Sequence, residues 1–245
     1  MDYAMETLRY DVCPYVADPV NAVREALQQK IKAQPLAVET IVNAFSAWHF
    51  RRASARGDQL SFSRKHATLS PLVLALTGST GTGKTETAWV LARALLSKTC
   101  RITGGTTDIP RGLITLNGGD YINEARVEEY HRAIRGKLAR RLKYCGGNVV
   151  VLFDEIQKAA PGTLDALTEA MSEHPRVTVE GSGWLWAGEG LGDSLDSSRV
   201  IFLLVSDVGS DGVNAAVMRH RSRSEVAAGP LQAAVKRSLD EQWDR

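Results

Sequence analysis

Four short runs of apolar residues predict the strands of one parallel sheet. The runs occupy 71–77, 112–117, 149–154 and 199–206, and Gly, Pro or polar residues border each of them. Uninterrupted apolar runs of this length are typical of strands that are buried on both faces. Because stretches with helical periodicity separate the runs, the pattern predicts repeated β-α units, an α/β fold in three layers with helices on both faces of the sheet.

Helical periodicity marks the segments between and around these runs. Asp18 followed by Pro19 is typical of a helix N-terminus, and the apolar residues from 20 to 31 then fall on one face. Later helices are predicted directly after 85, between 120 and 146, over 156–173 and over 231–243. Another helix is predicted from 35 to 52, with an apolar stripe made of Leu36, Val38, Ile41, Val42, Phe45 and Trp48.

These elements divide the chain into four parts. Residues 1–17 have no clear period and form a lead-in, while 18–70 supply two helices and a polar connector that pack on the core. The core itself spans 71–212, and 213–245 is a C-terminal helical segment.

Composition narrows the class of protein without naming a partner. Hydrophobic residues make up 44% of the chain and charged residues 24%, which is ordinary for a globular protein. The net charge of +2 favours neither nucleic acid nor membrane as the main partner. The N-terminus does not resemble a secretory signal, and no run reaches about 18 apolar residues, so we expect a cytoplasmic chain without a transmembrane segment.

A basic cluster lies in the predicted helix between 120 and 146. Aromatic side chains do not alternate with these basic residues, and no known reader motif is present, so we expect no nucleic-acid partner. The cluster consists of Arg132, Arg135, Lys137, Arg140, Arg141 and Lys143.

Cysteine and tryptophan carry weaker signals. Cys13, Cys100 and Cys145 are widely spaced and form neither a C-x-x-C motif nor a ligand cluster with His, so free buried thiols are expected. Trp184 and Trp186 belong either to an exposed hairpin that meets a partner or to covered packing, and packing is favoured.

The most specific motif is a glycine-rich loop between a predicted strand and a predicted helix. Gly78-Ser79-Thr80-Gly81-Thr82-Gly83-Lys84-Thr85 matches G-x-x-x-x-G-K-[ST] at each fixed position. Its glycines leave room for backbone N–H groups to point at phosphates. Lys84 is expected to bridge the β- and γ-phosphates, and the Thr85 hydroxyl is expected to ligate Mg²⁺. The loop therefore predicts that the chain binds ATP with Mg²⁺.

Two carboxylates, Asp154 and Glu155, stand at the end of the third run. Strand ends of a parallel sheet meet the phosphate loop at one edge, so Asp154 is expected to hold Mg²⁺ through its water shell. Glu155 is expected to accept a proton from the attacking water, or to orient it. The pair favours an ATPase over a P-loop kinase, which would be expected to carry a lid with paired arginines. The alternative that the chain is a nucleotide-dependent binding module with little turnover remains.

Four motifs in the right order resemble AAA+ ATPases of the Clp/torsin branch, from residue 20 to residue 210. The segment 31–38 resembles the V-x-G-Q-x-x-A-V entry helix, with Ala33 at the glycine position, and 78–84 resembles G-x-T-G-T-G-K. The segment 153–159 is similar to D-E-I-x-K-A, the extended Walker B motif of that branch. The segment 205–210 is similar to its sensor-1 strand, T-S-N-x-G-S. The resemblance implies an AAA+ large subdomain without its C-terminal lid, with Ile31 contacting the nucleotide.

The spacing is most similar to torsins. Residues 117–154 hold little more than one helix and no Gly-Tyr-Val-Gly pore segment, so threading of substrate is not implied. Thr85 stands where torsins usually have Asn, which makes the Mg²⁺ site resemble that of an ordinary ATPase. Asp207 stands where sensor-1 Asn is expected, and its carboxylate would repel a γ-phosphate unless it is protonated or turned to Mg²⁺. Slow hydrolysis is implied, or orientation of the water by Ser206.

The resemblance also implies partners. Arg245 falls where Clp proteins carry an arginine finger and is a candidate for that role, although the surrounding residues match poorly. Torsins lack the finger and are activated by proteins that supply one, so a homo-oligomer or a hetero-assembly with an activating partner is implied. The function that the resemblance implies is chaperone-like remodelling of a protein client. An upstream apolar segment would instead place the chain in the endoplasmic reticulum lumen or nuclear envelope.

Overall fold

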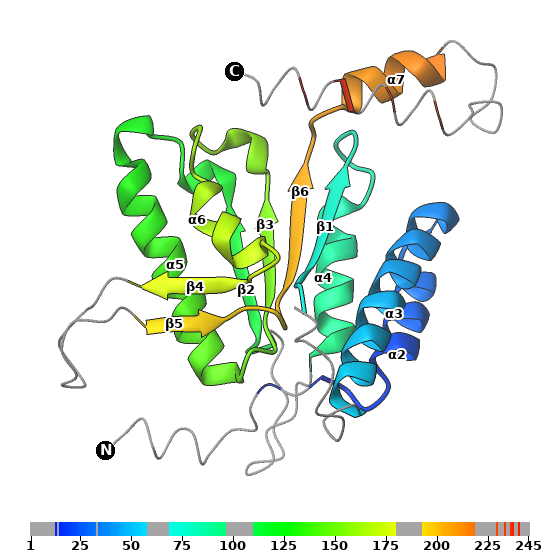
Figure 1. The fold of residues 1–245 in the computed structure, drawn as a ribbon. Helices are drawn as coiled ribbons and strands as arrows, with labels where there is room; N and C mark the ends of the chain where they lie inside the picture. The colour runs from blue at the N-terminus through cyan, green and yellow to red at the C-terminus, as the bar shows by residue number, and fades with distance from the viewer. Residues whose placement is uncertain are drawn as a thin grey trace.

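A parallel sheet of four strands forms the centre of the molecule. The computed structural model describes residues 13, 15–32, 34–57, 69–96, 110–179 and 193–218, together with Gly229, Ala233, Lys236, Arg237 and Asp240. Within this part, the strand order is β1-β6-β3-β2 and neighbouring strands are parallel (Figure 1). The strands are β1 (Leu72–Thr77), β2 (Leu113–Asn117), β3 (Val150–Asp154) and β6 (Ile201–Ser206). All four predicted strands are confirmed.

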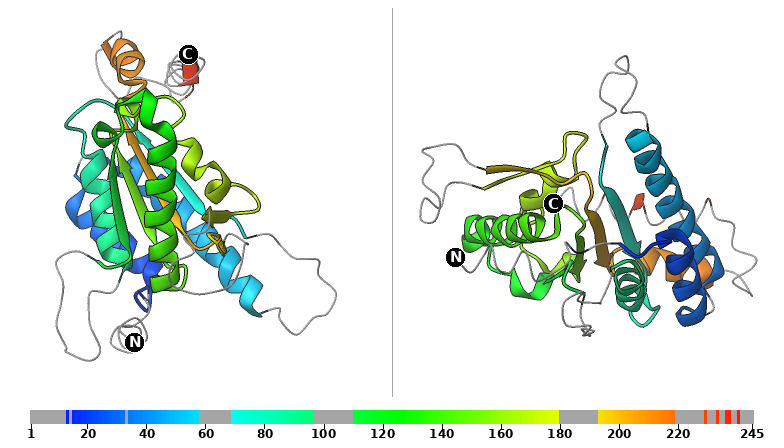
Figure 2. Two further views of the ribbon diagram at one scale, coloured as in Figure 1. Left: turned by 90° about the vertical axis from the view of Figure 1, so that its left-hand side faces the viewer. Right: turned by 90° about the horizontal axis from the view of Figure 1, so that it is seen from below.

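Helices cover both faces of this sheet, as the α/β pattern predicts (Figure 2). On one side lie α2 (Pro19–Lys30), α3 (Pro35–Gly57) and α4 (Lys84–Leu95), and on the other lie α5 (Val127–Cys145) and α6 (Asp165–Thr168). The remaining helix, α7 (Ser210–Met218), follows β6. Short 3-10 turns are η2 (Gly118–Asp120), η3 (Glu124–Arg126), η4 (Ile156–Lys158) and η5 (Glu169–Met171).

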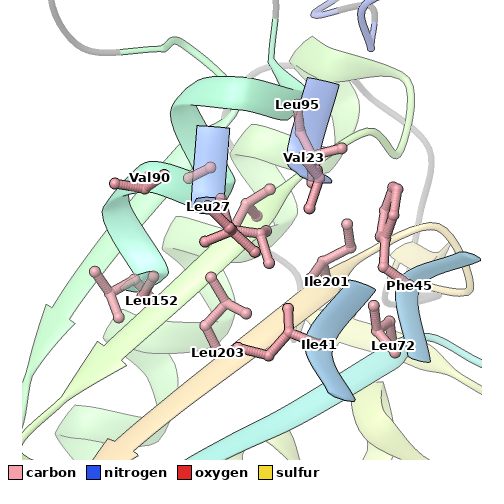
Figure 3. Close-up of a cluster of buried hydrophobic side chains, with 14 of the residues drawn as sticks. Val23, Leu27, Ile41, Phe45, Leu72, Val90, Leu95, Leu152, Ile201 and Leu203 are labelled. Atoms are coloured by element: carbon pink, nitrogen blue, oxygen red, sulfur yellow. The ribbon is translucent and has the colours of Figure 1, made fainter. Parts of the chain in front are cut away.

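Alternation along each strand builds a separate core on each face. Leu152, Ile201 and Leu203 point toward α2, α3 and α4, where they meet Leu27 and Phe45 (Figure 3). The residues between them point the other way and pack with α5. That second core includes Ile114, Val151, Phe153, Phe202, Ile134 and Leu138.

The edge position of β1 corrects one expectation. The first apolar run was expected to be buried on both faces, yet Val73 is 39% exposed and Ala75 is also exposed. Leu72, by contrast, is buried in the first core. Leu74 and Leu76 are partly buried against the same core, so one face of this edge strand packs on the helices while the face with Val73 and Ala75 is exposed.

Some helix predictions hold and others need correction. Asp18 caps α2, since its Oδ1 accepts a hydrogen bond from the Asn21 N–H at 3.2 Å. α3 continues to Gly57, beyond the expected end, and Leu36 is exposed instead of buried. The single helix expected over 156–173 is instead η4, α6 and η5. Pro161 and Gly162, which has φ +82°, separate the first of these turns from the others.

A second, antiparallel pair of strands lies beside α5. β4 (Arg176–Val179) pairs with β5 (Asp193–Asp196), a pairing that the sequence pattern did not predict. Trp184 and Trp186 lie between these strands and outside the described residues. Arg245 and most of the helix expected over 231–243 also lie outside them, although Ala233, Lys236, Arg237 and Asp240 are helical.

A disulfide joins the N-terminal segment to the core and corrects the expectation of free thiols. Cys13 and Cys145 are bonded across a sequence separation of 132, and both are buried. The segment after Cys13 is also held by the backbone, because the Val16 N–H donates to the Leu95 carbonyl at 2.9 Å. The side chain of Tyr15 donates to the Arg199 carbonyl at 3.1 Å. Cys100 lies outside the described residues.

Candidate nucleotide-binding site

The predicted motifs converge at the edge where the parallel strands end (Figure 1). The glycine-rich loop follows β1, the Asp154-Glu155 pair ends β3, and Asp207 follows β6. Register brings these ends together, because Thr77 of β1 pairs with Ser206 of β6. In open α/β sheets this edge is where ligands bind.

Backbone conformation explains the glycines of the loop. Gly78, Gly81 and Gly83 have φ values of 145°, 81° and 87°, which side-chain-bearing residues rarely adopt. A Cβ placed on Gly81 or Gly83 would meet no atom within 4 Å, so backbone conformation and not crowding selects glycine there. Gly83 is also the N-cap of α4, and the loop therefore leads directly to the N–H groups at the start of a helix.

Lys84 lies in the middle of the loop and is largely buried. Its Nζ donates to the carbonyl oxygens of Gly78 and Ser79 at 2.7 and 2.8 Å. The same nitrogen forms an ion pair with Asp207 Oδ1 at 2.7 Å, where the side chains are 11% and 39% exposed. The side chain is thus directed across the inside of the loop, as a phosphate-binding lysine requires.

Asp207 contacts the loop at two points. Besides its ion pair with Lys84, its Oδ2 accepts a hydrogen bond from the Thr80 hydroxyl at 3.1 Å. The hydrogen bond from Lys84 is the main cause that holds the pKa of Asp207 below its ordinary value, and the bond from Thr80 adds to it. The carboxylate is therefore ionised at neutral pH, so protonation does not relieve its charge.

Asp154 and Glu155 stand at the end of β3. The Glu155 N–H donates to Asp154 Oδ1 at 2.9 Å. Glu155 is the one non-glycine residue of the described chain with a positive φ, at 51°, and such conformations cluster at functional sites. Its Oε1 forms an ion pair with Lys158 Nζ at 2.6 Å.

Gln157 links the two acidic strand ends, and sequence reasoning missed it. Its side-chain Oε1 accepts hydrogen bonds from the Ser206 hydroxyl at 3.0 Å and from the Asp207 N–H at 3.4 Å. Ser206 is 2% exposed, and its hydroxyl oxygen accepts from the Val208 N–H. These bonds connect η4 to the end of β6. The variable position inside D-E-I-x-K-A was the only signal that could have pointed to Gln157.

The two remaining parts of the predicted site lie at helix ends. Thr85 is partly buried in the first turn of α4, next to Lys84. Ile31 ends α2, where its N–H donates to the Leu27 carbonyl at 2.8 Å. It lines a cavity of about 510 Å³ whose walls come from α2, α3 and the loop between them. Contact between Ile31 and a nucleotide stays a prediction.

These residues fit a nucleotide with Mg²⁺. The open space beside Gly81 and Gly83 and the helix N-terminus suit a chain of phosphates. Thr85 and Asp154 offer a hydroxyl and a carboxylate, and Mg²⁺ prefers oxygen ligands shared with substrate phosphates. The described part of the chain contains no group of three or more His, Cys, Asp or Glu side chains that could hold a metal ion.

Comparisons with known proteins agree with this geometry. The chain is 28% identical to the mitochondrial disaggregases of Bos taurus and Homo sapiens over alignments of 199 residues that cover 78% of this chain. Those matches cover 25% and 24% of the relatives, so the chain spans about a quarter of their length. In the described part of the chain, none of the helices is both long and apolar enough to span a bilayer.

Solved structures share the fold, and a family model covers most of the site. The S. cerevisiae Hsp104–ADP complex has a TM-score of 0.57 at 19% identity, covering 92% of this chain and 33% of that chain. A closed state of Hsp104 with ATPγS and FITC casein has a TM-score of 0.56 at 20% identity, covering 92% and 34%. The family model of ATPases associated with various cellular activities (AAA) matches residues 74–229. Because that match takes in more than half of the sequence, the chain belongs to the AAA family of ATPases.

Proposed function

We propose that the chain binds ATP with Mg²⁺ and hydrolyses it. The observation that carries the proposal is the convergence of the glycine-rich loop and Glu155 at one sheet edge. Lys84 would hold the β- and γ-phosphates, and Thr85 and Asp154 would hold Mg²⁺, which neutralises charge on the phosphates. Glu155 would take a proton from water, or orient it, for attack on the γ-phosphate.

Phosphate release by E155Q tests hydrolysis. The variant keeps the side-chain shape but cannot accept the proton, so turnover should fall by about 10²–10⁴-fold while ATP binding persists. E25Q removes a carboxylate from the exposed face of α2 and should behave like the unaltered protein. If the unaltered protein and E155Q both bind ATP but release phosphate only at the background rate, the ATPase proposal is wrong and the chain is a nucleotide-binding module.

The binding module is the second candidate, and the Lys84–Asp207 ion pair favours it. A lysine that is already neutralised by a carboxylate is a poorer partner for a transferring phosphoryl group. In that case nucleotide binding alone would be the signal. The ratio of hydrolysis to binding in the preceding experiment separates the two candidates.

We further infer a torsin-like assembly in which nucleotide state is passed to a partner or to a second copy. Residues 118–149, all described, contain η2, η3 and α5 between β2 and β3, which supports the absence of a pore segment. A route for coupling is the hydrogen bond from the Ser79 hydroxyl to Asn214 Oδ1 at 3.1 Å, which connects the loop to α7. An arginine finger from Arg245 or from an activating partner, and a protein client, belong to the same proposal.

Light scattering with and without nucleotide tests the assembly. An increase in mass with ATP, but not with the K84A variant, would support coupling through the loop. A mass that is the same in all conditions would leave nucleotide binding in place and remove self-assembly, so that only the hetero-assembly would remain.

A further inference from the structure

The carboxylate of Asp207 contacts Lys84, the residue that would hold a third phosphate in the proposed site. Lys84 Nζ has three hydrogen-bond donors, and three acceptors surround it: the carbonyls of Gly78 and Ser79 and Asp207 Oδ1. The other carboxylate oxygen accepts from the Thr80 hydroxyl. The only charged partner of the lysine among these three acceptors is therefore Asp207.

The backbone of Asp207 is also held in place, by the side chain of Gln157. Its backbone N–H donates to Gln157 Oε1 at 3.4 Å, and the neighbouring Ser206 hydroxyl donates to the same atom. Ser206 pairs with the last residue of β1, directly before the loop. These bonds fix the backbone of Asp207, so its carboxylate can leave Lys84 only by rotation of the side chain, with loss of the contacts to Lys84 and Thr80.

A diphosphate and a triphosphate make different demands on this arrangement. Backbone N–H groups of the loop and the start of α4 serve the phosphates that both nucleotides share. The γ-phosphate alone brings further negative charge to the end of the Lys84 side chain. It must either separate an ion pair of 2.7 Å or lie beside the carboxylate, and like charges at such short range repel.

We propose that Asp207 determines nucleotide specificity, so that the site favours a nucleoside diphosphate over the corresponding triphosphate. This inference rests on the proposed nucleotide site and adds a role in nucleotide selection for Asp207. Hydrolysis would then be limited by weak triphosphate binding and by slow release of the tightly bound diphosphate.

Calorimetric titration with ADP and with a non-hydrolysable ATP analogue, both with Mg²⁺, tests the proposal. The unaltered protein should bind ADP at least about tenfold more tightly than the analogue, the size expected of one partly screened like-charge contact. D207N removes the charge and should bring the two affinities within about threefold of each other, mainly by strengthening the analogue. D207S should do the same, which guards against misfolding of one variant.

D211N is the matched control. Asp211 lies in the first turn of α7, four residues from Asp207, and is exposed, so this variant makes the same change in net charge. It should keep the preference for ADP. K84A separates this inference from the proposed function: if the unaltered protein binds neither nucleotide, or if K84A binds both as tightly as the unaltered protein does, the nucleotide site itself is wrong. If nucleotides bind but the unaltered protein shows no preference for ADP, or D207N and D207S keep that preference, the role of Asp207 is overturned.

Discussion

The backbone of Gly118 lies against the carbonyl group of Glu155, with no room for a side chain between them. A Cβ on Gly118 would collide with the Glu155 carbonyl oxygen and would stand 2.9 Å from its carbonyl carbon. Both atoms belong to backbone, so neither can turn aside. Gly118 begins η2 directly after β2, so a side chain at this position would push against the backbone of Glu155, whose φ is 51°.

We expect G118A to impair hydrolysis more than nucleotide binding. The methyl group must displace Glu155, and misplacement of this proposed base should lower the rate roughly tenfold to a hundredfold. Overpacking should also lower the free energy of unfolding by about 1–3 kcal/mol. Phosphate release, nucleotide titration and thermal unfolding measure these effects.

G136A is the control for that variant. Gly136 lies inside α5, and a Cβ there would meet no atom within 4 Å. The change should leave hydrolysis intact and raise the free energy of unfolding by about 0.5–1 kcal/mol, because Ala favours a helix over Gly. Equal rates for G118A and G136A would contradict the role given to the Gly118 contact.

We expect Q157A to loosen the link between η4 and β6. Removal of Oε1 takes away the acceptor of the buried Ser206 hydroxyl, which costs about 1–3 kcal/mol of folding free energy. The ADP preference should weaken as well, since the Asp207 N–H loses the same acceptor. Chemical denaturation and calorimetry give the two readouts.

K158A tests whether that effect belongs to Gln157. Lys158 is the next residue, is 52% exposed and pairs with Glu155, so its loss should cost less than about 1 kcal/mol. A cost for K158A as large as that for Q157A would mean that η4 as a whole, and not the Gln157 amide, supports the strand end.

The ADP preference should not change with pH in the neutral range. The pKa of Asp207 lies below its ordinary value, so its contribution to stability is present above the ordinary value and is lost only as pH falls through the lowered one. Between about pH 6 and about pH 8 the carboxylate stays ionised, and the ratio of ADP to ATP-analogue affinity should be constant. With Mg²⁺ in excess to keep the terminal phosphates ionised, a preference that fades on acidification to about pH 6 would contradict the lowered pKa of Asp207.

Reduction of the disulfide should destabilise the protein. Cross-links over long loops typically contribute about 2–5 kcal/mol, and the Cys13–Cys145 bond spans 132 positions. Thermal unfolding with and without reductant should show this loss, and C13S should be as unstable without reductant as the unaltered protein is with it. C100S keeps the bonded pair and should respond to reductant like the unaltered protein. A C13S variant that loses further stability in reductant would contradict the pairing.

The fold was largely predictable because buried parallel strands leave a simple pattern. Their two covered faces demand continuous apolar runs, such as the five residues 149–153. β4 and β5 escaped because Arg176–Val179 and Asp193–Asp196 are short and rich in polar residues. The single helix expected over 156–173 was wrong because the prediction relied on the spacing of apolar residues. Pro161 and Gly162 interrupt the helix in the structure.

The site was predictable in its motifs but not in its contacts. Glycine spacing and strand ends placed Lys84, Asp154 and Asp207 at one edge, because a parallel sheet brings its carboxyl ends together. Their side-chain partners depend on distances of a few ångström between segments far apart in sequence. The Lys84–Asp207 pair is separated by 123 positions in the numbering, and nothing along the chain states that these two side chains meet.

The disulfide also changes what a single break in the backbone can do. Because Cys13 and Cys145 are bonded, the chain between them is a closed covalent ring that carries α2, α3, β1, α4, β2 and α5. A protease that cuts once anywhere inside this ring opens it without releasing a fragment. The cleaved protein would run as one species in a denaturing gel until reductant separates its two pieces.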